Sequence, residues 1–272
     1  MRREASHDFL TVTAIGVIAY AGVNVCHELI GHCGMVALMG TRCTQFSSTD
    51  IRLADTLPLW KYHVVVVAGS AANWALAFVC LALLRACAKA RPALRYLLFL
   101  SACVNLFLPG TYMLAAPVIR YGDSYILIST LPNQLLWRSV VVSAAAVICW
   151  LSFRLCRAEF VRLVGRSTRA DAWALVAPAY VAGGVVTVAS ALFSELPARW
   201  AQLQAAGGTF GLTVWLLLLP LGLPRAPTHA GETFTVPRSA GLIAAGALTA
   251  LVFVGLLGPG VPAPGASGAN SP

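Results

Sequence analysis

Charged residues are scarce in this sequence, and their scarcity excludes an ordinary soluble domain. Of the 272 residues, 11% are charged and 58% are hydrophobic, and the mean hydropathy is +0.77. A soluble domain carries about 25% charged residues. A chain in lipid must satisfy its backbone hydrogen bonds internally, which helices do. We therefore predict an all-α integral membrane protein that is embedded in the lipid bilayer.

Acidic residues and closely spaced cysteine pairs are also scarce. The chain has 10 Asp and Glu against 19 Lys and Arg, a net charge of +9. The basic residues lie in short loops between apolar runs, as topology signals do, so no nucleic-acid partner is expected. The eight cysteines include no Cys-x-x-Cys pair and do not resemble a secreted disulfide framework. We expect Cys26 and Cys33 to be small buried thiols.

The apolar runs predict a polytopic bundle of about six to seven transmembrane helices. The first run follows Met1-Arg2-Arg3 without a clear cleavage site, so we expect a retained helix and not a signal peptide. Pro109-Gly110 is expected to break or kink the third helix, and basic residues 154–169 to form an interfacial helix. The predicted spans are residues 9–39, 62–87, 96–119, 134–156, 172–193, 209–223 and 239–257.

Composition divides the chain into three regions. Residues 1–130 hold the polar motifs, residues 131–258 are additional membrane helices, and the Gly/Pro/Ala/Ser-rich tail 259–272 is expected to be disordered. Thr, Phe and Ile partly alternate in the polar segment 41–61. We predict a short strand or hairpin at the surface there, directly after the first helix.

The basic residues also predict the orientation. If the N-terminus is cytoplasmic and seven helices cross, most of the basic residues lie in inner segments, where the positive-inside rule places them. The outer segments then hold, of the 19 basic residues, only Arg42, Arg52, Lys61, Arg120, Arg138 and Arg199. We expect a bacterial cytoplasmic membrane with the N-terminus in the cytoplasm.

One stretch in the first apolar run carries ionisable side chains. The sequence Cys26-His27-Glu28-Leu29-Ile30-Gly31-His32-Cys33 places two histidines and a glutamate at membrane depth. Such groups are costly in lipid and are functional candidates by default. A His-Glu pair followed by a second His also suggests zinc, with the imidazoles as ligands and the carboxylate as general base for water.

The spacing of the two histidines leaves two arrangements open. The usual helical motif is H-E-x-x-H, with the histidines four apart, whereas His27 and His32 are five apart. On a regular α-helix five residues rotate by about 500°, so the two rings diverge by about 140°. A π-bulge would return both histidines to one face, and Gly31 loosens the backbone there. Alternatively, Glu28 and His32, four apart, share a face without a bulge.

Other polar residues lie at a similar predicted depth. Asn73 follows Gly69-Ser70-Ala71-Ala72 in the second helix, a small-residue patch that allows close approach of another helix. Asp123 ends the third segment and is the only acidic residue between Asp55 and Glu159. Under the predicted topology these residues share the outer layer of the membrane with the histidine motif. We therefore expect a single site.

The motifs together resemble the site-2 protease family of intramembrane zinc metalloproteases. That family has a His-Glu-x-x-His helix, a helix with a Gly-small-small-Asn-like patch, and a segment with Asn and Pro that leads to an Asp-containing turn. This chain has the corresponding residues in the same order, within roughly residues 10–130: His27-Glu28…His32, then Gly69…Asn73, then Asn105…Pro109…Gly122-Asp123.

The resemblance implies a chemistry for each residue. His27, His32 and Asp123 would bind Zn²⁺. Glu28 would be the general base, and Asn73 would assist at the substrate carbonyl. The implied reaction is hydrolysis of a peptide bond in a transmembrane protein or peptide.

The implied substrate must present an unwound strand, because a helical peptide hides its carbonyls in its own hydrogen bonds. We expect residues 46–53 to pair with that strand by strand addition.

Two other classes of protein fit the same residues. One is a catalytically inactive relative that serves as a membrane scaffold or binding protein, and absence of metal would favour it. The other is a different membrane metalloenzyme, in which Glu28 and His32 share a helical face and bind a metal such as iron. Tolerance of His27→Ala would favour that class. The oligomeric state stays open.

Overall fold

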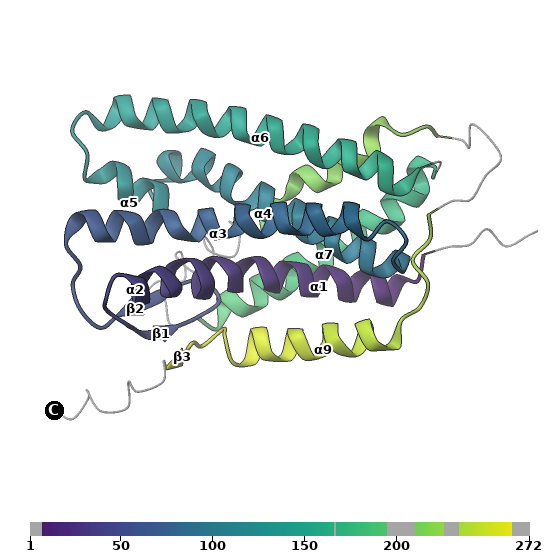
Figure 1. The fold of residues 1–272 in the computed structure, drawn as a ribbon, viewed down its shortest axis with the longest axis horizontal. Helices are drawn as coiled ribbons and strands as arrows, with labels where there is room; N and C mark the ends of the chain where they lie inside the picture. Colours follow the sequence, from purple (N-terminus) through teal and green to yellow (C-terminus); the bar gives the residue numbers. More distant parts are fainter. Residues whose placement is uncertain (1–6, 166, 195–209, 226–233, 263–272) are drawn as a thin grey trace, which may run out of the picture.

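The chain folds into a bundle of helices that run along a common direction, with three short strands at one end (Figure 1). This computed structural model describes residues 7–165, 167–194, 210–225 and 234–262. The helices long and apolar enough to cross a membrane are Phe9–Leu38, Leu59–Ala86, Pro92–Ile119, Gln134–Val164 and Arg169–Leu192. Shorter apolar helices cover Phe210–Gly222 and Ala240–Gly255. The predicted all-α polytopic membrane protein is confirmed.

The first long helix changes its winding along its length. It consists of α1 (Phe9–Val25), a π-helical segment η1 (Cys26–Cys33) and α2 (Gly34–Leu38), which follow one another without a break. Asp8 caps its start, because its carboxylate accepts a hydrogen bond of 2.8 Å from the Thr11 N–H. The helix therefore carries the histidine motif on a widened, continuous backbone.

The other helices enclose the first. Helix α1 packs against α4, α7 and α9, while α3 packs against η1 and α4. Much of α1 is consequently buried, and the histidine motif lies against α3. The bounds of these elements are α3 (Leu59–Ala86), α4 (Pro92–Ile119), α5 (Asp123–Ser129), α6 (Gln134–Val164), α7 (Arg169–Leu192), the 3₁₀ helix η2 (Val214–Gly222) and α9 (Ala240–Gly255).

Two expected features of the helices are absent from the described residues: a separate interfacial helix after the fourth span and a break at Pro109-Gly110. The basic segment after the fourth span is no separate interfacial helix, because α6 continues to Val164. Glu159 explains the continuation: it is 3% exposed and forms ion pairs with Arg85 and Arg162. These pairs turn part of the basic segment toward the bundle. Helix α4 likewise continues through Pro109-Gly110, so the chain does not break there.

The strands form a small sheet with the order β2-β1-β3, antiparallel throughout. Strands β1 (Cys43–Phe46) and β2 (Ile51–Leu53) make the hairpin predicted after the first helix. Strand β3 (Val261–Pro262) lies in the tail that was expected to be disordered, and its pairing with β1 explains its order. The rest of that tail, residues 263–272, lies outside the described residues. The sheet covers the end of the bundle near η1.

Candidate metal centre

The π-helical segment brings the two predicted histidine ligands together. The ring centroids of His27 and His32 lie 4.6 Å apart, with the rings nearly perpendicular. Of the two arrangements left open by the spacing, the structure has the first, and the π-winding extends over eight residues. A π-helix places residues i and i+5 one above the other, so a five-residue spacing suits it as a four-residue spacing suits an α-helix.

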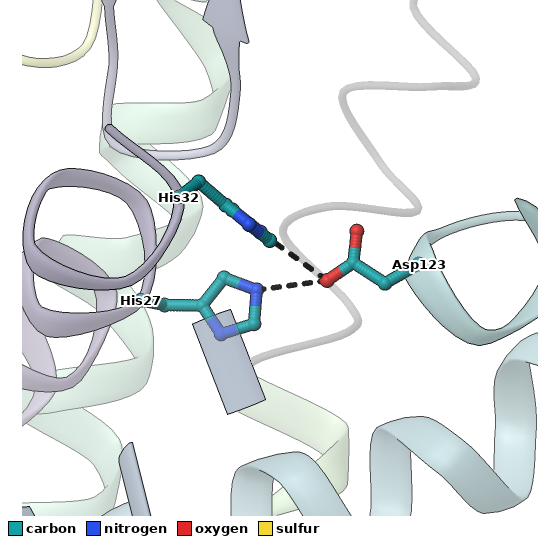
Figure 2. A group of neighbouring side chains, drawn as sticks. All are labelled: His27, His32 and Asp123. Atoms are coloured by element: carbon teal, nitrogen blue, oxygen red, sulfur yellow. Dashed lines mark hydrogen bonds and ion pairs between the residues drawn. The ribbon is translucent and has the colours of Figure 1, made fainter. Parts of the chain in front are cut away.

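Asp123 completes a group of three possible metal ligands. Its Oδ2 lies 3.1 Å from His27 Nε2 and 3.3 Å from His32 Nε2 (Figure 2). One ligand atom from each of the three residues lies within 4.8 Å of the others.

The hydrogen bond of His32 tests whether these residues fit a metal. His32 Nδ1 lies 2.8 Å from the carbonyl oxygen of Val65. A carbonyl only accepts, so Nδ1 carries a proton and the neutral ring has a bare Nε2 that faces the Asp123 carboxylate. Two acceptors facing each other are favourable when a cation lies between them. Two imidazole nitrogens and a carboxylate oxygen therefore fit a divalent metal ion, with Val65 orienting one ligand.

Glycines at the contact between η1 and α3 allow the histidines to lie where they do. A Cβ built on Gly69 would lie 2.7 Å from ring atoms of both His27 and His32. A Cβ built on Gly31 would lie 2.8 Å from the carbonyl oxygen of Ala68. The close helix approach predicted from the small-residue patch is confirmed, and the α3 backbone supports both rings.

Gly69→Ala is expected to lower the affinity of this group for a divalent metal ion by about tenfold or more while the chain still folds, because the new methyl group displaces both rings. Retention of the metal ion against a chelator measures this effect. Gly22→Ala is the matched control, since a Cβ at Gly22 in α1 meets nothing within 4 Å. Equal metal affinity of the two variants would contradict the supporting role of Gly69.

A cavity of about 530 Å³ lies beside the three ligands. Glu28 lines it, as do Asp50, Ile51 and Leu53 from the hairpin. Sequence reasoning missed four half-buried tyrosines of the lining, although two of them flank Asp123 closely in the sequence. These are Tyr62, Tyr112, Tyr121 and Tyr125.

Asn73 is fully buried in α3, and it is not among the residues that line this cavity. Within the described parts of the chain, neither atom of its side-chain amide has a hydrogen-bond partner. An unpaired buried amide costs about 1–3 kcal/mol, so it calls for a partner. The role of Asn73 at a substrate carbonyl stays a prediction.

A disulfide joins Cys33 to Cys43 and corrects the expectation of a buried thiol at Cys33. The chain reverses after α2, and β1 returns alongside the end of η1, which brings the two sulfurs together. Cys26 is free and buried, as predicted. The pairing was missed because the two residues lie in different predicted elements.

Comparison with protein-family models, with curated proteins and with solved structures gives no match to this chain. Similarity therefore adds nothing to the functional argument. The features of the chain that bear on its function are the His27, His32 and Asp123 group, Glu28, and the cavity beside them.

Proposed function

We propose that this chain is an intramembrane zinc metalloprotease that hydrolyses peptide bonds of membrane-embedded substrates. The observation that carries the proposal is the convergence of His27, His32 and Asp123 beside a cavity that Glu28 also lines. Asp123 lies 96 positions after His27 in the sequence, so the fold has to bring it to the two histidines. This combination of ligands and carboxylate suits metal-assisted hydrolysis.

Each residue has a role in the proposed reaction. His27, His32 and Asp123 would hold Zn²⁺, which when bound supplies Lewis-acid activation of water and of the scissile carbonyl. Glu28 accepts the proton of the attacking water and delivers it to the leaving amine. The hydrogen bond from His32 to Val65 keeps the imidazole in one tautomer and orientation.

The unpaired amide of Asn73 supports its proposed role as a donor to the developing oxyanion. It lies one helical turn after Gly69, where an added Cβ would overlap both imidazoles. A substrate carbonyl that reaches this position would supply the partner that the amide lacks among the described residues.

The hairpin supports binding of the substrate as a strand. Strand β1 is enclosed by β2 and β3, whereas β2 has no second strand partner in the described part of the chain. An edge strand presents N–H and C=O groups to a further strand. Because Ile51 and Leu53 of β2 line the cavity, a peptide added there would pass beside Glu28.

We place the protein in a bacterial cytoplasmic membrane with the N-terminus in the cytoplasm. The excess of basic residues in the inner segments supports this orientation. The disulfide Cys33–Cys43 supports it independently: it joins η1 to β1, and the strands lie at the end of the bundle opposite the start of α1 (Figure 1). Disulfides form and persist in oxidising compartments and are rare in the cytosol.

The metal content of the purified chain tests the proposal first. We expect about one zinc ion per chain in the wild type and none in His32→Ala, because removing one of three protein ligands weakens a catalytic site severely. Elemental analysis of detergent-purified protein measures the content. His63→Ala is the matched control, since His63 lies outside the ligand group and bonds to Thr130.

The same measurement separates the proposal from its two rivals. Absence of metal from both the wild type and His32→Ala would favour the inactive membrane scaffold. Iron in the wild type, with metal retained by His27→Ala, would favour a different membrane metalloenzyme. The convergence of both imidazoles on Asp123 argues against that second rival.

A further inference from the structure

We propose that the disulfide Cys33–Cys43 positions the zinc ligands, so that its reduction by a dithiol weakens metal binding. The inference rests on the proposed metal centre and adds control of that centre by the redox state of its surroundings. Two separate connections lead from the disulfide to His32, one through the backbone and one through packing.

The backbone connection is short. Cys33 is the last residue of η1 and directly follows the ligand His32. Its partner Cys43 is the first residue of β1, the central strand of the sheet. The disulfide therefore ties the end of the ligand-bearing helix to a strand that is hydrogen-bonded on both sides.

The packing connection runs through Val65. Cys43 is 8% exposed and belongs to a small buried cluster with Val36 and Val65. Val65 is the residue whose carbonyl accepts the hydrogen bond from His32 Nδ1. The half of the disulfide that belongs to β1 thus packs against the residue that orients one imidazole.

The disulfide is placed to restrain the π-helical winding of η1. Long π-helices are rare, and relaxation to an α-helix is the expected alternative. Such a relaxation would rotate the backbone after the bulge by about 100° and separate the two imidazoles. It would also turn Cys33 away from β1. The covalent bond to Cys43 opposes that rotation and so favours the register in which His27 and His32 converge.

The redox step is an ordinary thiol–disulfide exchange. A dithiol gives up two electrons and two protons and becomes a disulfide, while the bond between the two sulfurs breaks and leaves two thiols. Cys33 is half-buried, so one sulfur of the pair is within reach of such a reagent. After reduction, the only covalent connection between the hairpin and η1 is the chain itself, through α2 and the loop that follows it.

The test compares zinc affinity of the full-length, detergent-purified chain before and after reduction. Dithiothreitol is used as the dithiol and removed by gel filtration without oxygen, and zinc is then titrated against a chromophoric chelator. Thiol titration in denaturant should find six thiols before reduction and eight after it. We expect reduction to weaken zinc binding by about tenfold to a hundredfold, as loss of an orienting contact does.

Variants and reoxidation show whether a change in zinc affinity is due to the Cys33–Cys43 disulfide. Cys33→Ser/Cys43→Ser should bind zinc as weakly as the reduced wild type and should not respond to dithiothreitol. Cys87→Ser, which alters a free and half-buried cysteine, should behave as the wild type. Reoxidation of the reduced wild type should restore the affinity, which a misfolded chain would not do.

Three results would overturn the inference, and two of them separate it from the proposed function. Equal zinc affinity in the oxidised and reduced wild type would overturn the role of the disulfide and leave the metal centre standing. Absence of zinc binding in every state would overturn both. Eight thiols before reduction would show that Cys33 and Cys43 are not joined, and would again remove only the role of the disulfide.

Discussion

Glu28→Gln is expected to bind zinc as the wild type does and to cleave peptide bonds about a hundredfold to ten-thousandfold more slowly. Glutamine has nearly the same size as glutamate, so the variant keeps the packing of η1. Its amide cannot accept the proton of an attacking water. The loss should fall on the rate of the chemical step, because Glu28 is not one of the three ligands.

The measurement uses proteoliposomes that contain the variant and a panel of single-spanning peptides, each with a helix-breaking segment that exposes a strand. Asp50→Asn is the matched control, because Asp50 is a second carboxylate of the cavity lining and has no proposed catalytic role. Cleavage by Glu28→Gln at the wild-type rate would rule out Glu28 as the general base. Loss of zinc from the variant would assign Glu28 to the metal instead.

The fold and most of the ligand group were accessible from the sequence for physical reasons. Lipid forces long apolar helices, so hydropathy alone located the spans. Ionisable residues at membrane depth are rare, which made His27, His32 and Asp123 stand out against an apolar background. The rotation of an α-helix showed that His27 and His32 share a face only with a π-turn, one of the two arrangements left open, and η1 has that winding.

Features that depend on tertiary packing could not be predicted from the sequence in this way. Nothing in the local sequence shows that Cys43 returns to the end of η1, because that depends on the path of the loop and the hairpin. The continuation of α6 past residue 156 depends on the burial of Glu159 between two arginines. The tyrosines of the cavity come from three separate segments, and only the fold brings them together.

The backbone conformation of Gly122, directly before Asp123, should also have a large effect on zinc binding. Gly122 has φ 87° and ψ −179°, a conformation that is essentially restricted to glycine. A Cβ at this position would also overlap the hydroxyl group of Tyr112. Because Asp123 is the next residue and begins α5, any shift at Gly122 moves the third ligand.

We therefore expect Gly122→Ala to lose zinc almost as completely as Asp123→Ala, measured as zinc per purified chain. Gly40→Ala is the matched control: Gly40 has φ 82°, and a Cβ there meets nothing within 4 Å. That variant carries the backbone strain, about 1–3 kcal/mol, without the overlap and away from the ligands. Retention of zinc by Gly122→Ala would mean that α5 adjusts to the new side chain, and that the turn does not fix the position of Asp123.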